Sequence, residues 1–461
     1  MEPVSTIVGL LASFGPAVTA RTAENLAVLF RGAILAHGPR TITGCLVAAW
    51  PWVTKHWSAY ANVARRARLN LLALARVLFL RVMDLVPPNT VVTLAIDESL
   101  VRRYGPFVVG IGMHRDAVRS SHSRVQVTPG HKWVTLSVVV KLPFVDRALA
   151  LPVVSVLYTT AKHAARNRTK RLYRRHRTVP ELALLMVRMV VRWAPGCRFR
   201  VLGDGSYGTH DLADAFNPRS RYTSLRRVSL VSRFHMDAAT YAAPPPYAGR
   251  GRPRVKGEQL PSPRQVAASA DTCWSRATVA WYGATRKDVL LCSQTGLWYR
   301  CGSEATPVRW VLVRDPEGKR GDEVFFTTET TLEAKEVVEA FVWRWGLETT
   351  FQESRSLLGL ETLRNRATRA VGRSVPMLLS VYSLVVVWFA KHVSAPESWK
   401  RNTPWYTKSS VTFSDMLEAA RQDILREGFS PRPGAETDDS ILQTPPESHP
   451  YAALMAIGRT A

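Results

Sequence analysis

The sequence predicts an α/β protein whose core is interrupted by a β-rich insertion and preceded by a helical N-terminal domain. In residues 1–88, apolar residues recur at three- and four-residue spacing, which is typical of helices. In residues 89–232, short β-branched runs alternate with helical segments, and residues 233–331 contain several further β-type runs. Helical periodicity returns in residues 332–395, which would complete the core. Residues 396–461 are predicted to form a C-terminal helix and a disordered tail rich in Pro, Ser and Asp.

The helical domain is predicted from two amphipathic segments, residues 23–35 and 69–85, and Pro87 and Pro88 end the second one. Between them, two short helices joined by a tight turn resemble a helix-turn-helix DNA reader. The second of these helices and its flanks, residues 55–68, carry Lys, Ser, Tyr and Arg side chains. An ordinary helical packing domain with a solvated basic face explains the pattern equally well.

The core prediction depends on short apolar runs that end at acidic residues. The run at residues 91–96 is continuously apolar, as expected for a buried strand, and it ends at Asp97. A second run at residues 199–202 precedes Asp204, which lies between two glycines. Further strands are predicted at residues 107–112 and 133–140, a helix at 180–193, and strands of the β-rich insertion at 278–282, 289–291, 308–313 and 323–328.

The charge balance predicts a polyanionic partner. The chain contains 62 Lys and Arg against 36 Asp and Glu, a formal net charge of +26, and nucleic acid is the commonest polyanion for such a protein. A merely basic protein of the ribosomal type fits less well, because 46% hydrophobic residues and 14 Trp require large packed cores.

The sequence also predicts a cytoplasmic, nucleoid-associated location. The five cysteines are scattered, without a CxxC pair or a His at zinc-finger spacing, as expected for reduced thiols. The N-terminus does not resemble a signal peptide. The longest apolar run, residues 376–390, is short for a bilayer and contains two serines, so we interpret it as a buried core helix and expect no membrane association.

Three acidic residues, Asp97, Asp204 and Glu348, are the candidate catalytic residues. Acids at strand ends and on a packed helix can converge at one edge of a sheet. Three carboxylates together repel one another unless divalent cations neutralise them, and oxygen-only ligation favours Mg²⁺ or Mn²⁺. Two such ions suit phosphodiester displacement. Each acid also has an ordinary alternative: Asp97 as a turn cap, Asp204 as a turn residue, and Glu348 as an ion-pair partner of Arg344.

Glu348 lies in a segment whose functional side chains share one helical face. At about 100° per residue, Phe341, Arg344, Glu348 and Arg355 fall within an arc of about 60°. Two cations beside one acid suit a site that holds a metal and binds phosphate.

Three motifs together resemble those of bacterial DDE transposases of the insertion-sequence-four-like group. The third motif of that group reads Tyr-x2-Arg-x3-Glu-x6-Lys, and its spacing matches the segment that begins at Phe341. That match rests on the four residues of the helical face described above. The other two motifs are Ala95-Ile96-Asp97-Glu98-Ser99 and Gly203-Asp204-Gly205. The resemblance covers roughly residues 89–395 and implies an RNase H-like core with a β insertion between the second Asp and the Glu.

The resemblance implies a metal-dependent transposase. Asp97, Asp204 and Glu348 would be the catalytic metal ligands for Mg²⁺ or Mn²⁺, two ions in all. The protein would cleave double-stranded DNA at the ends of its element and join these ends to target DNA. Since two ends must be paired, a homodimer on DNA is expected. The alternatives are a transposase-derived DNA-binding protein without catalysis and a simple RNase H-like DNA nuclease.

The resemblance also implies a set of DNA-contacting residues. Arg344 and Arg355 would bind phosphates, and Trp345 would stack on a flipped base, with core packing as the alternative for this indole. Phe341 replaces the Tyr of the family and loses a hydroxyl, and Arg355 replaces a Lys, which keeps the charge but changes its geometry.

A separate DNA contact is predicted from the stretch Gly249-Arg250-Gly251-Arg252-Pro253. It resembles an AT-hook, whose extended arginines lie in a narrow minor groove. The alternative is a basic surface loop at the start of the β-rich insertion.

Overall fold

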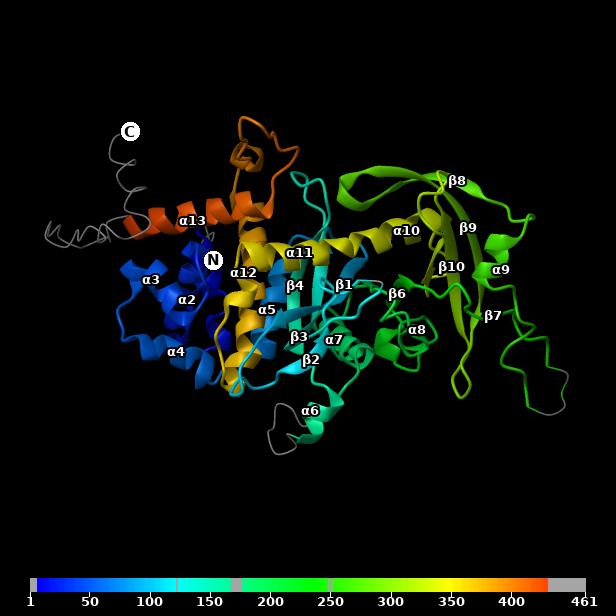
Figure 1. The fold of residues 1–461 in the computed structure, drawn as a ribbon, viewed down its shortest axis with the longest axis horizontal. Helices are drawn as coiled ribbons and strands as arrows, with labels where there is room; N and C mark the ends of the chain where they lie inside the picture. The colour runs from blue at the N-terminus through cyan, green and yellow to red at the C-terminus, as the bar shows by residue number, and fades with distance from the viewer. Residues whose placement is uncertain (1–5, 122, 167–175, 248, 250–251, 430–461) are drawn as a thin grey trace, which may run out of the picture.

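The computed structural model describes residues 6–429, except residues 122, 167–175, 248 and 250–251 (Figure 1). The C-terminal helix predicted for residues 396–461 is present as α13 (Phe413–Phe429). The predicted tail, residues 430–461, lies outside the described residues.

One 11-stranded mixed sheet organises the described chain. Its strand order is β2-β3-β1-β5-β6-β11-β10-β9-β7, with β4 paired to β3 and β8 paired to β9. β1 is antiparallel to β3 and parallel to β5, and β5 is parallel to β6, a mixed order compatible with the RNase H-like core that the resemblance implies. The strands are β1 (Val92–Arg102), β2 (Gly112–Arg115), β3 (Val127–Val140), β4 (Leu149–Leu157), β5 (Phe199–Leu202), β6 (Val228–Arg233), β7 (Thr240–Tyr241), β8 (Ser275–Ala280), β9 (Arg286–Trp298), β10 (Thr306–Arg314) and β11 (Glu323–Thr327).

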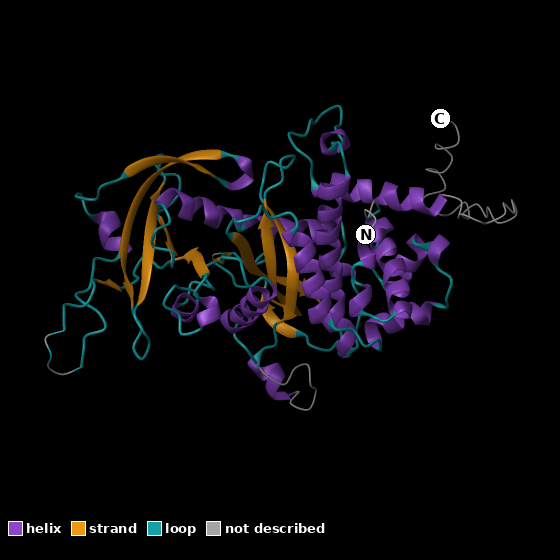
Figure 2. Cartoon of the chain, turned by 180° about the vertical axis from the view of Figure 1, so that it is seen from behind, coloured by secondary structure: helices purple, strands orange, loops and turns teal. Residues whose placement is uncertain are grey.

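Many helices gather around one end of this sheet, and the strands β8, β9 and β10 lie at the other end (Figure 2). α11 (Trp345–Ser356) and α12 (Thr368–His392) contact β4, and α7 (Val179–Trp193) contacts β3. Several N-terminal helices pack directly on α12. The other helices are α1 (Ile7–Ala12), α2 (Ala20–Leu35), α3 (Ile42–Ala48), α4 (Trp57–Arg65), α5 (Leu71–Met83), α6 (Ala161–Arg166), α8 (His210–Ala215), α9 (Pro263–Ala268) and α10 (Ala334–Trp343).

The predicted pair of short N-terminal helices is present as α3 and α4. A short 3-10 turn, Trp50–Trp52, joins them. Tyr60 of α4 is buried in a small apolar cluster with Val28 and Leu46, so this ring is a packing residue and not a reader of DNA bases. Whether the basic flank of α4 contacts DNA stays a prediction.

Two strand predictions in the core were wrong. β1 does not end at Asp97 but continues to Arg102, because it pairs along this whole length with β3, where Asp97 lies opposite Thr135. Residues 107–111 do not form a strand. They belong to a looped segment in which Gly105 and Gly110 adopt positive φ angles of 117° and 86°, which an extended ladder does not accept.

Four strands were not predicted: β2, β4, β6 and β7. β4 contains Pro152, which reads as a strand breaker, but the structure accommodates it at an irregularity where Leu136 pairs with Val154 and Ser137 pairs with Pro152. The four strands predicted within residues 233–331 are present as β8 to β11. Because β6 pairs with β11, these strands extend the core sheet and do not form a separate sheet.

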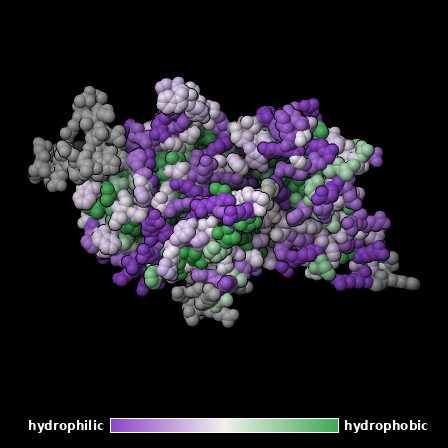
Figure 3. Space-filling view, in the orientation of Figure 1, coloured by the Kyte–Doolittle hydropathy of each residue, from purple (hydrophilic) through white to green (hydrophobic). Residues whose placement is uncertain are grey.

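Helix α12 is the one helix in the described residues that is long and apolar enough to cross a membrane. In this structure, 72% of its most apolar window is buried inside the protein, between β4 and the surrounding helices. This arrangement matches the buried core helix predicted for the longest apolar run. Hydrophilic side chains cover much of the molecular face in Figure 3.

Candidate active site

The strand register brings Asp97 and Asp204 to the same edge of the sheet. In the parallel pair of β1 and β5, Ala95 lies opposite Leu202, the last residue of β5. Each aspartate lies two residues beyond this pair, and paired strands are about 4.8 Å apart. The predicted convergence of these two acids is therefore present, although β1 itself continues past Asp97.

A tight turn holds Asp204 in place. The Ser206 backbone N–H and hydroxyl donate to Asp204 Oδ1 at 2.9 and 2.6 Å, and the Ser232 hydroxyl donates to the Asp204 carbonyl at 2.7 Å. Gly203 is required before it, because a Cβ there would lie 2.6 Å from Cβ of Tyr207. The two serines fix one carboxylate oxygen and the backbone.

Arg344 contacts both Glu348 and Asp97. It lies at the junction where α10 ends and α11 begins, and it is only 8% exposed. Its Nη1 donates to Asp97 Oδ2 at 2.9 Å, and its Nη2 is 2.7 Å from Glu348 Oε1. The internal ion pair considered as an alternative for Glu348 is thus present, and Arg344 also reaches Asp97.

At this site, one guanidinium faces three acidic side chains. Burial raises the pKa of Asp97 to about 7; Arg344 opposes this rise, and Asp204 adds to it. Burial acts to lower the pKa of Arg344, but Asp97, Glu348 and also Asp204 together raise it. All three acids therefore act on the single guanidinium of Arg344.

The donors at this edge fit a hard divalent cation better than zinc, because they are carboxylate oxygens without a thiol or imidazole among them. Within the described residues, no group of three or more His, Cys, Asp or Glu side chains lies close enough to hold a metal ion. Arg344 instead lies between Asp97 and Glu348. The chemistry of the donor set fits Mg²⁺ or Mn²⁺, and a bound ion would compete with Arg344 for these two acids.

Arg355 lies beside the same stretch of β1. Its Nη2 donates to the Ser99 hydroxyl, two residues from Asp97, and its Nε is 3.4 Å from Glu361 Oε1. Glu361 also contacts Arg102 at 3.4 Å. Arg355 therefore lies close to the acids but is held by Ser99 and Glu361.

The remaining predicted residues of this helical segment separate into two environments. Phe341 is 2% exposed and packs on Phe325 with ring centroids 4.3 Å apart, so its assignment as a DNA contact is not compatible with this structure. Phe341 does share a face with Arg344, whose guanidinium lies 5.3 Å from the centre of its ring, but Phe325 of β11 covers this ring. Trp345 is 41% exposed, so it does not pack in the core. Its ring and that of Tyr282 form an edge-to-face pair with centroids 5.3 Å apart.

The two predicted minor-groove arginines lie elsewhere. Arg252 is exposed on the long loop between β7 and α9, and Arg250 lies outside the described residues. Nothing in the described part of the chain connects Arg252 with the three acids.

Sequence reasoning missed a second group of polar residues next to Asp97. The Tyr207 hydroxyl donates to Glu98 Oε2 at 3.0 Å, and Lys132 Nζ lies 2.5 Å from Glu98 Oε1. Tyr207 is fully buried, and burial together with Glu98 raises its pKa well above the usual range. The sequence signal that could have identified this group was the position of Tyr207, three residues after Asp204.

Glu353, five residues after Glu348, has a structural environment. Its carboxylate is 2.7 Å from Arg147 Nη2 and accepts a hydrogen bond of 2.8 Å from the Tyr382 hydroxyl. Arg147 also donates to the Thr349 hydroxyl. This network ties the loop between β3 and β4 to α11 and α12.

Glu353→Ala is expected to destabilise the protein by about 2–3 kcal/mol, because it leaves Arg147 without its ion-pair partner. Chemical denaturation measures this loss. Tyr382→Phe is the matched control and should cost less, since it removes one hydrogen bond and keeps the ion pair. A Glu353→Ala protein that is as stable as wild type but no longer cleaves DNA would reassign the third acid to Glu353.

Comparison with known families places these residues in context. The sequence profile described as "DDE superfamily endonuclease" matches residues 13–288, more than half of the chain. The match includes Asp97 and Asp204 and ends before Glu348. No match to a curated protein was found.

Proposed function

Because this chain belongs to the DDE superfamily of endonucleases, we propose that it is a transposase that cleaves DNA at the ends of a mobile element and joins those ends to target DNA. The observation that carries this proposal is the arrangement of Asp97, Asp204 and Glu348 around Arg344 at one edge of the sheet. Three acids that together exceed one counter-charge are suited to phosphodiester chemistry that uses divalent cations.

In this proposal, Asp97, Asp204 and Glu348 hold two Mg²⁺ or Mn²⁺ ions. When bound, the ions supply the positive charge that activates an attacking oxygen and stabilises the leaving oxygen. The chain contributes a rigid frame for this site: β1 positions Asp97, and the Ser206 contacts orient Asp204. The Asp97 side chain is 13% exposed, so the protein covers most of it.

The cations of the site would hold the DNA strand. Arg344 would exchange Asp97 and Glu348 for a phosphate when the acids engage their ions, since a guanidinium binds phosphate in the same bidentate way as a carboxylate. Arg355 lies near enough to Ser99 to contact the neighbouring phosphate. Double-stranded DNA is the proposed substrate, in a homodimer that pairs two element ends in the nucleoid.

A DNA-binding protein without catalysis is the second candidate. It is favoured by the way Arg344 bridges Asp97 and Glu348, an arrangement that could persist as a permanent ion pair. A simple nuclease that cleaves without joining is the third candidate.

The test uses purified full-length protein, Mg²⁺ and DNA that carries the inverted repeats flanking the gene. Wild type should cleave the ends and join them to a target plasmid, and Asp97→Ala, Asp204→Ala and Glu348→Ala should do neither. A wild type that binds but does not cut supports the second candidate, and cutting without joining supports the nuclease. Activity in the alanine variants would remove these acids from the mechanism.

Trp345→Ala is expected to weaken the binding of DNA with an unpaired or flipped base by about 1–3 kcal/mol, because a half-exposed indole provides a stacking surface. Stability should hardly change, since the side chain is not in the core. Anisotropy titrations with a cleaved-end duplex measure the effect, and Trp345→Phe serves as the control that keeps a ring. Equal affinities for wild type and Trp345→Ala would exclude stacking by this residue.

A further inference from the structure

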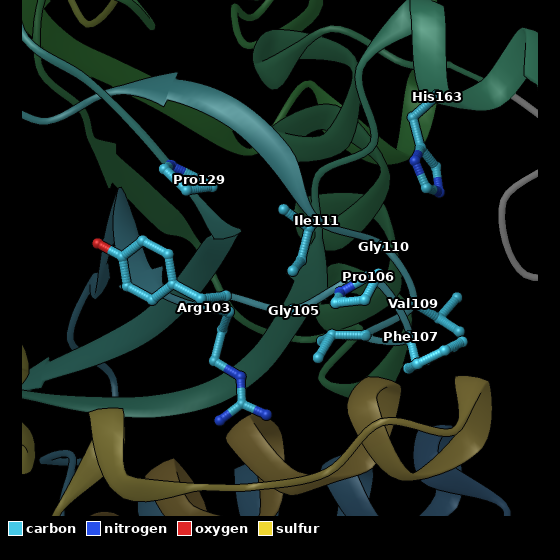
Figure 4. Close-up of a pocket in the computed structure, with 11 residues that line it drawn as sticks. Arg103, Gly105, Pro106, Phe107, Val109, Gly110, Ile111, Pro129 and His163 are labelled. Atoms are coloured by element: carbon cyan, nitrogen blue, oxygen red, sulfur yellow. The ribbon is translucent and has the colours of Figure 1, made fainter.

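A cavity of about 620 Å³ lies at the C-terminal end of β1, and the segment that follows this strand forms most of its wall (Figure 4). Arg103 lies on one side of it and His163 on the other, and Ile111 lies between them. The segment from Arg103 to Ile111 was predicted in part as a strand, but it forms this wall instead.

Two hydrogen bonds to backbone carbonyls hold this segment against the loop that precedes α12. Arg103 Nη2 donates to the Asn365 carbonyl at 2.8 Å, and the Val109 N–H donates to the Arg366 carbonyl at 3.2 Å. His131 contacts the Val109 carbonyl at 2.9 Å from the other side. The wall is therefore a built surface, supported by two distant parts of the chain.

The charge of this surface is uncompensated. Arg103, Arg364 and Arg366 lie close enough that burial and the two neighbouring guanidiniums lower the pKa of Arg103. Among the residues that the structure describes, no Asp or Glu side chain forms an ion pair with these three arginines. The nearby acids Asp116, which follows β2, and Glu361 pair with Arg102. Like charges gathered without counter-charges favour an anionic ligand.

Large aromatic rings stand exposed beside these arginines. Phe107 is 77% exposed and Tyr104 is 62% exposed. Phe107 follows Pro106 in a turn, and the positive φ angles of Gly105 and Gly110 shape the loop that presents it. A duplex keeps its bases stacked on one another, so exposed rings add affinity only for unpaired bases, whereas arginines bind the phosphates of either form.

We propose that this surface, formed by Arg103, Tyr104, Phe107, Arg364 and Arg366, binds an unpaired DNA strand. The phosphates contact the exposed Arg364 and Arg366, and a base stacks on Phe107 or Tyr104. Arg103 is only 7% exposed and contributes its charge and its hydrogen bond to the Asn365 carbonyl. The choice of DNA as the nucleic acid rests on the proposed function. β1 connects Asp97 to Arg103 over roughly 20 Å, so one strand can pass from the acids to this surface.

The proposal is tested by binding in EDTA, where cleavage does not occur. Fluorescence anisotropy follows a labelled single strand of about 12 nucleotides and its duplex at several salt concentrations. The variants are Phe107→Ala and the double substitution Arg364→Gln with Arg366→Gln, all at exposed positions that do not endanger folding. The matched control removes two exposed arginines from other places, Arg192→Gln with Arg219→Gln.

Phe107→Ala should weaken single-strand binding about tenfold and leave duplex binding unchanged. The Arg364→Gln/Arg366→Gln protein should lose about tenfold and show a salt slope smaller by about 1.4, the value for two lost phosphate contacts on a single strand. The control pair should lose less affinity. A 5-iodouracil strand should photocrosslink to the peptide that contains Tyr104 and Phe107.

Two results would overturn the proposal: Phe107→Ala binding the single strand as wild type does, or arginine losses no larger than those of the control pair. Cleavage by wild type with Mg²⁺ is measured separately. If wild type cleaves DNA but the variants bind the single strand normally, the proposed surface is refuted and the proposed function is not. A protein that never cleaves while the variants lose single-strand binding refutes the proposed function and leaves the surface as a nucleic-acid site.

Discussion

Asp204→Asn is expected to reduce DNA cleavage by about 1,000-fold or more, because the loss of one charged ligand removes several kcal/mol of transition-state stabilisation. The fold should be unaffected. An Asn side chain keeps the oxygen that accepts hydrogen bonds from Ser206, and only the negative charge disappears. The measurement is a single-turnover cleavage assay with Mg²⁺, together with a thermal unfolding curve.

The matched control for this variant is Ser206→Ala. It removes the hydroxyl that donates to Asp204 but keeps the carboxylate and the backbone N–H contact. We expect a loss of activity that is much smaller than that of Asp204→Asn. If Asp204→Asn cleaves at the wild-type rate, Asp204 is a turn residue and not a ligand.

Arg344→Gln is expected to destabilise the metal-free protein by about 3–5 kcal/mol. Among the described residues, Arg344 is the cation that contacts Asp97 and Glu348, and its loss leaves the largely buried Asp97 carboxylate, which is 13% exposed, without an ion-pair partner. Mg²⁺ should restore part of the loss, because divalent cations that bind only the folded state stabilise it by mass action. The rise in unfolding temperature on addition of Mg²⁺ should therefore be larger in the variant than in wild type.

Arg200→Gln provides the control for Arg344→Gln. Arg200 pairs with Glu329 at 2.9 Å, and both side chains are largely buried, but this pair is not part of the acid site. The control should lose stability without gaining sensitivity to Mg²⁺. An Arg344→Gln protein whose unfolding temperature responds to Mg²⁺ no more than the control would mean that the three acids do not bind the ion.

The parts of the fold with strong local patterns were predictable from the sequence. The β-branched run that forms β5 and the amphipathic segments that form α2 and α7 carry their own periodicity, and the structure confirms them. β4 was missed because Pro152 argues against a strand when only the sequence is known. Its acceptance depends on the register with β3, a tertiary feature.

The sequence located the candidate site residues, whose catalytic role stays a prediction, but not their environments. The end of a continuously apolar run located Asp97, two flanking glycines located Asp204, and helical spacing connected Glu348 with Arg344. The burial of Phe341 was not predictable, because it depends on the packing of this ring on Phe325 of β11, which is a tertiary contact. The neighbouring pair of Glu98 and Tyr207 was missed because strand β1 had been expected to stop at Asp97.

The central claim is that Asp97, Asp204 and Glu348 share divalent cations, and anomalous diffraction from crystals grown with Mn²⁺ tests it most directly. The account predicts Mn²⁺ peaks in direct contact with oxygens of all three residues, with Arg344 displaced from Asp97 and Glu348. Crystals in which Arg344 keeps both contacts, and in which no Mn²⁺ peak lies beside these acids, would contradict it.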